Sequence, residues 1–385
     1  MNRESGIFRN VPSTGEPFRA FVPHPLPPEP PLQMDDRLIS LTAEAALSIG
    51  RLDGISDMLP EMSLFLYFFI RKEALLSSQI EGTQSSLNEL LLFEEERENV
   101  RPSDDVLEVS NHISALEFGV QRLQSLPLSL RFIRELHAIL LAQGRGSARN
   151  PGEFRRSQNW IGGSRPGNAH YVPPPPELLM DCLGSLEQFM QSDNGRYSPV
   201  IKAALIHAQF ESIHPFLDGN GRIGRLLISL YLLASGVTRH PILYLSLYFK
   251  RNRTRYYDLL QGTRSSGNFE DWVEFFLHGV IECAGSGIAT ATNLLATARQ
   301  DADSLRGLGR RSGSLLQVHA ALQRYPLTSA VQLSEETRLS LPTVNTALEL
   351  MLEAGMVSEM TGQARHRRYR YDRYIDLISE GTEPL

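Results

Sequence analysis

Twelve consecutive residues near the middle of the chain combine the side-chain types that phosphate chemistry needs. The segment reads His214-Pro-Phe-Leu-Asp-Gly-Asn-Gly-Arg-Ile-Gly-Arg225. A histidine that is neutral near pH 7 can accept the proton of an attacking hydroxyl. Asp218 is the residue type that holds a magnesium ion bridging phosphate oxygens. The segment therefore predicts a base, a metal ligand and an anion clamp in one place.

The flanking residues predict two helices that hold this segment in a loop. Ser198 is a suitable N-cap for the first helix, and Pro215 disfavours helical geometry at His214, so that helix is expected to end there. The glycines within Gly219–Gly221 allow backbone N–H groups to converge. A second helix is expected from about residue 222 to 235, and a helix start behind a glycine loop binds anions.

Two arginines of the second helix are expected to face the same way. Arg222 and Arg225 are three residues apart and should point back over the first turn of their helix. With the loop they would form a cradle for a polyphosphate. A calcium loop of the EF-hand type is excluded, because Arg222 and Ile223 stand where an oxygen ligand and a glycine are needed. A plain turn with a structural histidine is the remaining non-functional interpretation.

The twelve-residue segment resembles, at every fixed position, the signature HPFx[DE]GNGRxxR of the Fic family. The resemblance implies a helical Fic core that transfers AMP from ATP to a Ser, Thr or Tyr hydroxyl of a target protein, or of itself, and releases pyrophosphate. It implies His214 as the general base and Asp218 as the magnesium ligand. It further implies Gly219, Asn220 and Gly221 with Arg222 as the anion hole, and Arg225 as the γ-phosphate clamp.

The similarity to Fic proteins extends from a proline-rich arm at residues 22–31 to about Phe276. Residues 158–163 resemble the family's flap, a hairpin that can hold a target segment by strand addition. In that resemblance Ile161, Gly162 and Gly163 border the nucleotide. The alternative is a surface hairpin without a function.

Further nucleotide contacts are predicted more loosely. Tyr248, Asn252 and Tyr256 recur every four residues, so they are expected to share a helix face, and with Tyr257 they could line an adenosine pocket. Aromatic residues at helical spacing also form cores, which is the competing interpretation. Gln209 is added as another candidate.

A second short segment predicts a built-in inhibitor. Ser77-Ser-Gln-Ile-Glu81-Gly82 resembles the inhibitory pattern [ST]xxxE[GN] of Fic proteins whose inhibitory helix precedes the core. Ser77 and Glu81 are four residues apart and are neighbours on one helix face. The resemblance implies that Glu81 pairs with Arg225 and occupies the space of the γ-phosphate. Some related proteins use this glutamate to remove AMP, so the direction of the reaction stays open.

The expected fold class is mainly α. It comprises a helical Fic core with a small β-hairpin flap at residues 154–173 and a C-terminal winged helix-turn-helix domain. The expected parts are listed here in chain order: residues 1–110, the proline-rich arm and an N-terminal helical region with the inhibitory helix; residues 111–300, the catalytic core; residues 306–314, a linker; and residues 315–385, the winged helix.

The last part is predicted from its pattern of helices. Helices are expected at residues 315–324, 329–337 and 342–354, followed by a glycine-containing hairpin. Arginines at or after that hairpin form a basic patch, which comprises Arg365, Arg367, Arg368, Arg370 and Arg373. The patch suits DNA, whereas the absence of lysine and arginine from helix 342–354 suits a protein partner or a dimer.

Composition limits the remaining choices. The net charge of −6 provides no overall attraction to nucleic acid or a membrane. Only Cys182 and Cys283 are present, which fits a reducing cytoplasm, and no apolar run is long enough for a signal peptide or a membrane span. Lys72, Lys202 and Lys250 are the only lysines, so a Walker A motif is excluded.

Expected partners are a target protein along the flap, DNA or a protein at the winged helix, and a second copy in a homodimer. Two other functions stay open. One is a DNA-binding regulator whose Fic core senses nucleotide, and the other is a Fic enzyme that uses a donor such as UTP or CDP-choline.

Overall fold

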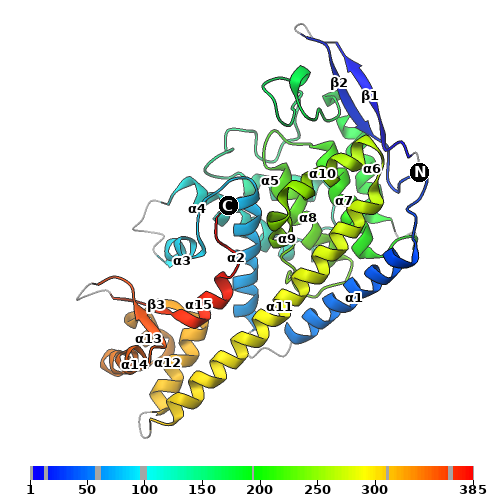
Figure 1. Cartoon of the computed structure of the whole chain (residues 1–385). Coiled ribbons are helices and arrows are strands. Elements are labelled where there is room, and N and C mark those ends of the chain that lie inside the picture. The colour runs from blue at the N-terminus through cyan, green and yellow to red at the C-terminus, as the bar shows by residue number, and fades with distance from the viewer. Residues whose placement is uncertain are drawn as a thin grey trace.

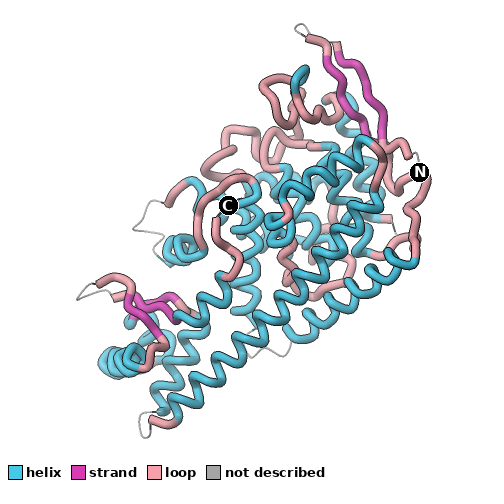
Figure 2. The backbone as a smooth tube through the Cα atoms, viewed as in Figure 1, coloured by secondary structure: helices cyan, strands magenta, loops and turns pink. Residues whose placement is uncertain are grey.

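The computed structural model describes residues 3–12, 16–56, 62–95, 102–192, 195–308, 312–362 and 367–384. Helices dominate the described chain, and the strands lie in two small sheets near its ends (Figure 1 and Figure 2). The predicted mainly α class is therefore confirmed. None of the described helices is both long and apolar enough to cross a membrane.

The first half of the chain is helical where the apolar periodicity predicted it. Its helices are α1 (Asp36–Ser56), α2 (Met62–Ile80), α3 (Leu87–Glu95), α4 (Asp104–Arg122) and α5 (Leu130–Leu140). The break between α2 and α3 has the predicted chemistry. Gly82 has a φ of 103°, and the backbone N–H groups of Ser86 and Glu89 donate to each other's side chains at 2.7 and 3.2 Å.

The centre of the molecule is formed by α7 (Pro199–Ile213) and α8 (Asn220–Ala234), which pack against each other. Ser198 caps α7 as predicted, since its Oγ accepts the N–H of Ile201 at 3.4 Å. Every residue from Val200 to Ile213 is buried, so α7 has no solvent face. The helix is held from all sides, which fixes the position of the residues at its end.

Around this pair lie α6 (Pro176–Gln191), α9 (Ser246–Arg251), α10 (Arg253–Ser265) and α11 (Phe269–Arg306). With 38 residues, α11 spans about 57 Å and runs from the core to the C-terminal part, packed along α1 (Figure 1). Its Trp272 is fully buried and donates its indole N–H to the carbonyl of Ala204 in α7 at 2.8 Å. This bond satisfies the indole while its rings fill the core.

The C-terminal part follows the order helix, strand, helix, helix, strand, strand, helix. The elements are α12 (Ser312–Arg324), β3 (Leu327–Ser329), α13 (Ala330–Thr337), α14 (Leu341–Glu353), β4 (Val357–Glu359), β5 (Arg368–Tyr371) and α15 (Asp372–Ser379). The strands form an antiparallel sheet in the order β3-β5-β4. The three expected helices occur within a few residues of their predicted bounds, whereas β3 and α15 were not predicted. The name winged helix stays an interpretation of this order.

The predicted linker is wrong at both ends. Arg306 is the last residue of α11, and Ser312 to Ser314 form the first turn of α12, so only residues 307–311 separate the two helices. The glycine and serine content of residues 306–314 predicted a loop there. Because α11 and α12 pack against each other, each helix instead extends into this range. The expected domain limits at 110 and 300 fall inside α4 and α11.

The predicted β-hairpin flap is also wrong in its extent. Residues 154–173 contain one β-bridge, between Ile161 and Tyr171, and a 3-10 turn, η1 (Pro166–Asn168). Gly162 and Gly163 have φ values of 69° and 70°, so the chain leaves extended geometry directly after Ile161. The hairpin that does exist was not predicted and joins β1 (Gly6–Val11) to β2 (Phe18–Pro23).

A buried carboxyl in α2 gives the first testable prediction. Glu73 is enclosed between α2 and α9, where its carboxyl accepts the N–H of Ser246 at 3.2 Å and also contacts that residue's Oγ. Burial raises the pKa of Glu73 to about 7. The folded state therefore favours the protonated form, and this contribution to stability is complete below pH 4.5 and is lost as the pH rises through 7.

Glu73→Gln, which imitates the protonated form, should leave the free energy of unfolding nearly unchanged near pH 4. It should raise that energy by on the order of 3 kcal/mol at pH 8.5. Urea unfolding of both proteins at the two pH values measures the difference. An effect that is the same at both values would contradict this assignment.

Candidate active site

His214 ends α7 in a left-handed conformation, with φ 48° and ψ 63°. The proline that follows excludes the helical region for this residue, as the sequence predicted. The turn is fastened from the flap side, because Arg155 and Asn159 donate to the carbonyl of His214 at 3.0 and 3.2 Å. The backbone of the catalytic candidate is therefore held by two side chains that the sequence did not single out.

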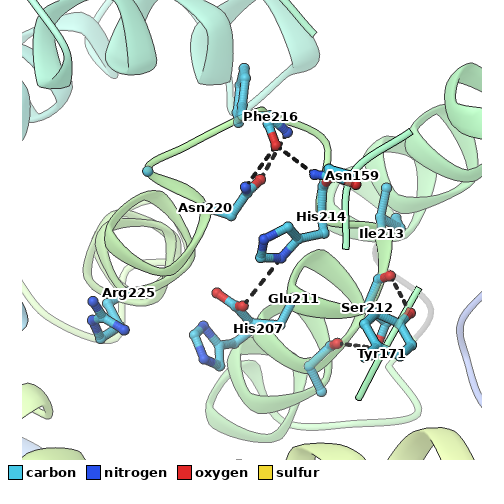
Figure 3. Close-up of polar contacts among 12 residues, drawn as sticks. Asn159, Tyr171, His207, Glu211, Ser212, Ile213, His214, Phe216, Asn220 and Arg225 are labelled. Carbon is cyan, nitrogen blue, oxygen red and sulfur yellow. Dashed lines mark hydrogen bonds and ion pairs between the residues drawn. The ribbon is translucent and has the colours of Figure 1, made fainter. Parts of the chain in front are cut away.

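The loop between α7 and α8 is closed by Asn220. Its Oδ1 accepts the N–H of Phe216 at 2.8 Å, and its Nδ2 donates to the carbonyl of the same residue at 2.9 Å (Figure 3). His137 stacks on the Phe216 ring at 3.7 Å and its Nε2 lies 3.0 Å from the Asp218 carbonyl. Asn220 was predicted in the anion hole, and its side chain instead stabilises the loop that forms it.

The start of α8 is occupied by the carboxylate of Glu81. A Cβ at Gly221 would lie 2.2 Å from Oε1 of Glu81, so only glycine leaves room for this carboxylate against the helix. Gly219, with φ 75°, begins the turn into α8, which starts at Asn220 and thus two residues earlier than predicted. An acidic side chain therefore lies where the positive end of the helix favours an anion.

Arg225 is held by the inhibitory segment of α2. Its guanidinium donates from Nη2 to Oε1 of Glu81 at 2.7 Å and to the carbonyl of Ser77 at 2.9 Å, and from Nε to Oγ of Ser77 at 2.8 Å. The guanidinium is buried, and Glu81 raises its pKa in spite of that burial. Burial opposes the ionisation of Glu81, but Arg225 outweighs it and lowers the pKa of this carboxyl. The predicted pairing of Glu81 with Arg225 is present, and Ser77 adds two bonds that were not predicted.

Arg222 has its own partners, although its charge, like that of Arg225, lowers the pKa of the Glu81 carboxyl. Its Nη1 donates to Oε2 of Glu108 in α4 at 3.0 Å, and its Nη2 lies 3.4 Å from Oδ1 of Asp218. Arg145, half exposed at the rim, shares Glu108 at 2.7 Å. Glu108 was missed, although an acid among the buried positions of an amphipathic helix is a signal that could have identified it.

The imidazole of His214 is neutral at pH 7. Burial lowers its pKa to about 3, and the positive charges of Arg264 and Arg155 act in the same direction. Its Nδ1 lies 3.8 Å from Oε2 of Glu211, one turn earlier on α7 (Figure 3). A neutral ring is the form that a general base needs.

A cavity of about 340 Å³ connects these groups. It is lined by residues 217–222, by His214 and by Glu81 and Arg145. Asp218 faces it with a partly exposed carboxylate, whose Oδ1 accepts the N–H of Gly219 at 2.6 Å. One accessible carboxylate beside a phosphate site fits magnesium, which proteins commonly hold through one or two carboxylates plus substrate phosphates. Within the described residues no three acidic, histidine or cysteine side chains form a separate metal cluster.

Several residues that were predicted to contact the nucleotide do not line the 340 Å³ cavity. Gln209 donates to the carbonyl of His24 at 2.9 Å and so secures the proline-rich arm. Asn252 lies between α9 and α10, so Tyr248, Asn252 and Tyr256 do not share one continuous helix as predicted. The Nδ2 of Asn252 donates to the carbonyl of Tyr248 at 3.0 Å. Tyr248 packs in the core against Phe275.

The remaining aromatic candidates divide between core and surface. Tyr256 is buried and its hydroxyl bonds Nε2 of His207 at 2.8 Å, which favours the core interpretation. Tyr257 is partly exposed, and its pKa is raised to about 12 by burial and by the charge of Glu81. Ile161, Gly162 and Gly163 are not among the described residues that line the 340 Å³ cavity. The glycines serve the turn itself, since a Cβ at Gly163 would lie 2.4 Å from the Asn168 carbonyl.

The basic patch of the C-terminal part is partly neutralised. Arg370 pairs with Asp372 at 2.7 Å and also with Asp376, and Arg373 lies 3.9 Å from Asp301. Arg365 lies outside the described residues. The charges available for DNA are thus fewer than the sequence indicated.

A histidine, a partly exposed carboxylate and two arginines thus meet at the start of a buried helix on a helical scaffold. Residues 39–121 match the Fic/DOC family N-terminal domain and residues 127–232 match the Fic/DOC family domain. The chain thus contains both of these Fic/DOC family domains, which together cover just under half of its residues. They contain Ser77, Glu81 and the whole segment from His214 to Arg225.

Curated relatives agree with this assignment over part of their length. The protein adenylyltransferase Fic of Drosophila virilis is 35% identical over 153 residues, which are 40% of this chain and 28% of the relative. The protein adenylyltransferase Fic of Aedes aegypti is 35% identical over 149 residues, 38% of this chain and 27% of the relative. The match thus spans little more than a quarter of these relatives.

Solved structures support the fold. A Fic family protein from Desulfovibrio desulfuricans G20 superposes with a TM-score of 0.58 at 20% identity, over 89% of this chain and 97% of that chain. Fic-1 of C. elegans, residues 134–508, superposes with a TM-score of 0.51 at 22% identity, over 66% of this chain and 76% of that chain.

The shared acid beneath the loop yields a prediction about stability. Glu108→Ala leaves the buried guanidinium of Arg222 without its main partner and should lower the free energy of unfolding by about 3 kcal/mol. Arg145→Ala removes the half-exposed partner of the same carboxylate and should cost about 0.5 kcal/mol or less. Urea unfolding of the two variants beside the parent tests this. Equal losses would show that Glu108 is not the main partner of Arg222.

Proposed function

We propose that this protein transfers AMP from ATP to a hydroxyl group of a target protein, and to itself, and that Glu81 keeps this activity low at rest. The observation that carries the proposal is the set of bonds from Arg225 to Glu81 and Ser77, formed at the start of α8 and beside His214. The Glu81 carboxylate thus occupies the start of α8, which favours anions, next to the neutral imidazole of His214. The partial match to proteins named adenylyltransferase supports AMP as the transferred group.

The phosphates of ATP would replace Glu81. Once Glu81 leaves, the buried guanidinium of Arg225 lacks an anion, which is costly, and a γ-phosphate provides one. The N–H groups of residues 219–221 and the positive end of α8 would hold the remaining phosphate charge. Arg222 would contribute a further positive charge, while Glu108 keeps the Arg222 guanidinium in place.

His214 would act as the base. The oxygen of the target hydroxyl forms a bond to the α-phosphorus, and the bond from that phosphorus to the pyrophosphate oxygen breaks. The hydroxyl proton moves to the imidazole, which burial and neighbouring arginines keep neutral beforehand. The products are the AMP-modified side chain and pyrophosphate.

Asp218 would hold magnesium together with ATP. Bound there, the ion neutralises phosphate charge. The Asp218 carboxylate is turned to the cavity by its bond from Gly219 and stays accessible. The two bonds of the Asn220 side chain fix the loop, so the Asp218 carboxylate keeps its position relative to His214.

The target would bind along the flap. Asn159 joins the flap to the carbonyls of His214 and Phe216, so a target segment held there lies beside the base. The neighbouring Trp160 is partly exposed and provides apolar surface for such a segment. Formation of a homodimer, or binding of a partner at the C-terminal part, would be a further property beside this AMP transfer.

Glu81→Gly tests the function directly. With ATP and magnesium it should modify itself or a lysate protein at least ~10-fold faster than the parent, because it frees Arg225 for the γ-phosphate. His214→Ala added to this variant should abolish the transfer. Intact-protein mass spectrometry measures the gain of one AMP group, and peptide mapping locates it. Competition with GTP, CTP, UTP and CDP-choline identifies the donor.

Matched substitutions separate this effect from general damage. Glu44→Gly changes an exposed glutamate in the middle of α1, and His278→Ala changes a half-exposed histidine of α11. Neither should alter the transfer rate. If Glu81→Gly transfers no AMP with magnesium or manganese, the adenylyltransferase proposal fails.

A further inference from the structure

Glu211 lies in the last turn of α7 and faces the base. Its carboxyl is 6% exposed, and Oε2 lies 3.8 Å from Nδ1 of His214 (Figure 3). Within the described part of the chain, neither that Nδ1 nor Oε1 of Glu211 has a hydrogen-bond partner. Oε2 of this buried carboxyl therefore lies just beyond bonding distance of Nδ1, while Oε1 is turned to Gly224.

The packing of α8 leaves room for this carboxyl. A Cβ at Gly224 would lie 2.7 Å from Oε1 of Glu211 and 3.2 Å from the ring of His207. Any other residue at this position would displace the acid from His214. Gly224 occupies a variable position of the signature pattern, so its role is set by Glu211 rather than by the phosphate loop.

The charges around Glu211 favour a functional role over a purely structural one. It is faced by Arg225 from α8 and by Arg264, Tyr256 and Tyr257 from α10. Glu81 of α2 and the two histidines of α7, His207 and His214, complete the set. Burial raises the pKa of Glu211 to about 7, and Arg225 opposes this rise. The carboxyl thus changes its charge in the range where the enzyme would work.

We propose that Glu211 is a positioning residue for His214. Its carboxylate attracts the proton on Nδ1, so that Nε2 is left unprotonated to receive the proton of the target hydroxyl. It also stabilises the imidazolium that forms when the hydroxyl oxygen bonds to the α-phosphorus and pyrophosphate leaves. Glu211 itself gains and loses no proton in the step. The inference rests on the proposed function.

Kinetics in the Glu81→Gly background test this role. Adding Glu211→Gln, which keeps the shape and removes the charge, should lower kcat by ~10 to 100-fold. The KM for ATP should change less than about twofold if Arg225 is unaffected. The rise of kcat with pH that follows the ionisation of Glu211 in the Glu81→Gly protein, which lies lower than in the unmodified chain because Glu81 no longer raises the pKa of Glu211, should disappear in the Gln variant. An unchanged kcat and pH profile, or a loss confined to KM, would overturn the proposal.

A spectroscopic measurement keeps the test independent of activity. In the otherwise unchanged chain, the ring ¹⁵N signals of His214 should show an inflection near pH 7 as Glu211 ionises beside Nδ1. Glu211→Gln should remove this inflection while the unfolding midpoint confirms a folded protein. An inflection that persists in the variant, or is absent from both proteins, contradicts the pairing. A failure of the Glu81→Gly assay alone would instead count against the proposed function.

A segment near the C-terminal end of the chain contacts α2. Residues 380–384 follow α15 and run beside α2, the helix that carries Ser77 and ends directly before Glu81 (Figure 1). Gln79, fully buried between those two residues, donates from Nε2 to the carbonyl of Thr382 at 2.8 Å. We call residues 380–384 the bracing segment.

The bracing segment is fixed by buried cations. Lys250 of α9 donates to Oε1 of Gln79 at 2.7 Å and also to the carbonyl of Glu383. Lys72, two turns before Gln79 on α2, is buried with its ammonium 5.0 Å from the ring of Tyr244. Burial lowers the pKa of Lys72 to about 8, and the charge of Glu380 opposes the shift. These contacts attach the segment to α2 and α9 together.

The bracing segment is continuous with the C-terminal part. β5 ends at Tyr371 and α15 begins at the next residue, so the two move together. The hydroxyl of Tyr371 donates to Asp301 of α11 at 2.6 Å, and Tyr374 of α15 lies against Phe68 of α2 at 6.4 Å between ring centres. A shift of the β4–β5 hairpin therefore reaches α2 through α15.

We infer that the bracing segment holds α2 where Glu81 reaches Arg225, so that the C-terminal part sets the resting activity. This inference also rests on the proposed function. A chain ending at Ser379 should transfer AMP ~10-fold faster than the full chain, because Glu81 is held less firmly. In the Glu81→Gly background the same truncation should change the rate less than about twofold, since there is no contact left to weaken.

Two further measurements keep this test decisive. Gln79→Leu in the full chain removes the bonds of Gln79 with Ser85, Thr382 and Lys250 and should also raise the rate, which covers the case of a truncated chain that unfolds. Hydrogen exchange of residues 70–82 should accelerate in both variants even if no transfer is observed. An unchanged rate and unchanged exchange, or an equal acceleration with and without Glu81, would overturn the inference.

Discussion

The buried guanidinium of Arg225 is the constraint on which the site depends. A cation enclosed by protein needs an anion and hydrogen-bond acceptors, because an unpaired buried charge costs several kcal/mol, of the order of 3 to 5. Here Ser77 of α2 and Glu81 directly after that helix provide them, 148 and 144 residues earlier in the chain. A phosphate meets the same requirement. In the proposed function Glu81 and the γ-phosphate are therefore alternative partners of Arg225, and only the phosphate permits transfer.

Other features follow from this competition. Gly221 leaves room for the Glu81 carboxylate at the start of α8, and the same open backbone suits phosphate oxygens. Glu108 keeps Arg222 ordered in either state, while the bonds of Asn220 and Asn159 keep the loop and the flap beside His214. The helices α7 and α8 are buried almost completely, which makes this geometry rigid. Residues 68–80 of α2 are buried as well, whereas Glu81 directly after them is exposed, so Glu81 is the partner of Arg225 that can leave.

The sequence predicted the local chemistry well and the distant partners poorly. The contact of Glu81 with Arg225 followed from a family pattern, and the end of α7 at His214 followed from Pro215. The partners Glu108 and Gln79–Thr382 join segments far apart, and no local periodicity encodes such pairs. Arg222 and Arg225 both act on the charge of Glu81, but the partner that each guanidinium has on a distant helix is encoded by no local pattern.

In the proposed function Glu81 excludes the γ-phosphate from Arg225. The most direct test compares the affinities of ATP and ADP by calorimetry in the unmodified protein and in Glu81→Gly. We expect nearly equal affinities in the unmodified protein, and ~10 to 100-fold tighter binding of ATP than of ADP in the variant, since a charge-assisted contact is worth ~1.5–3 kcal/mol. An ATP preference that is the same in both proteins would contradict it.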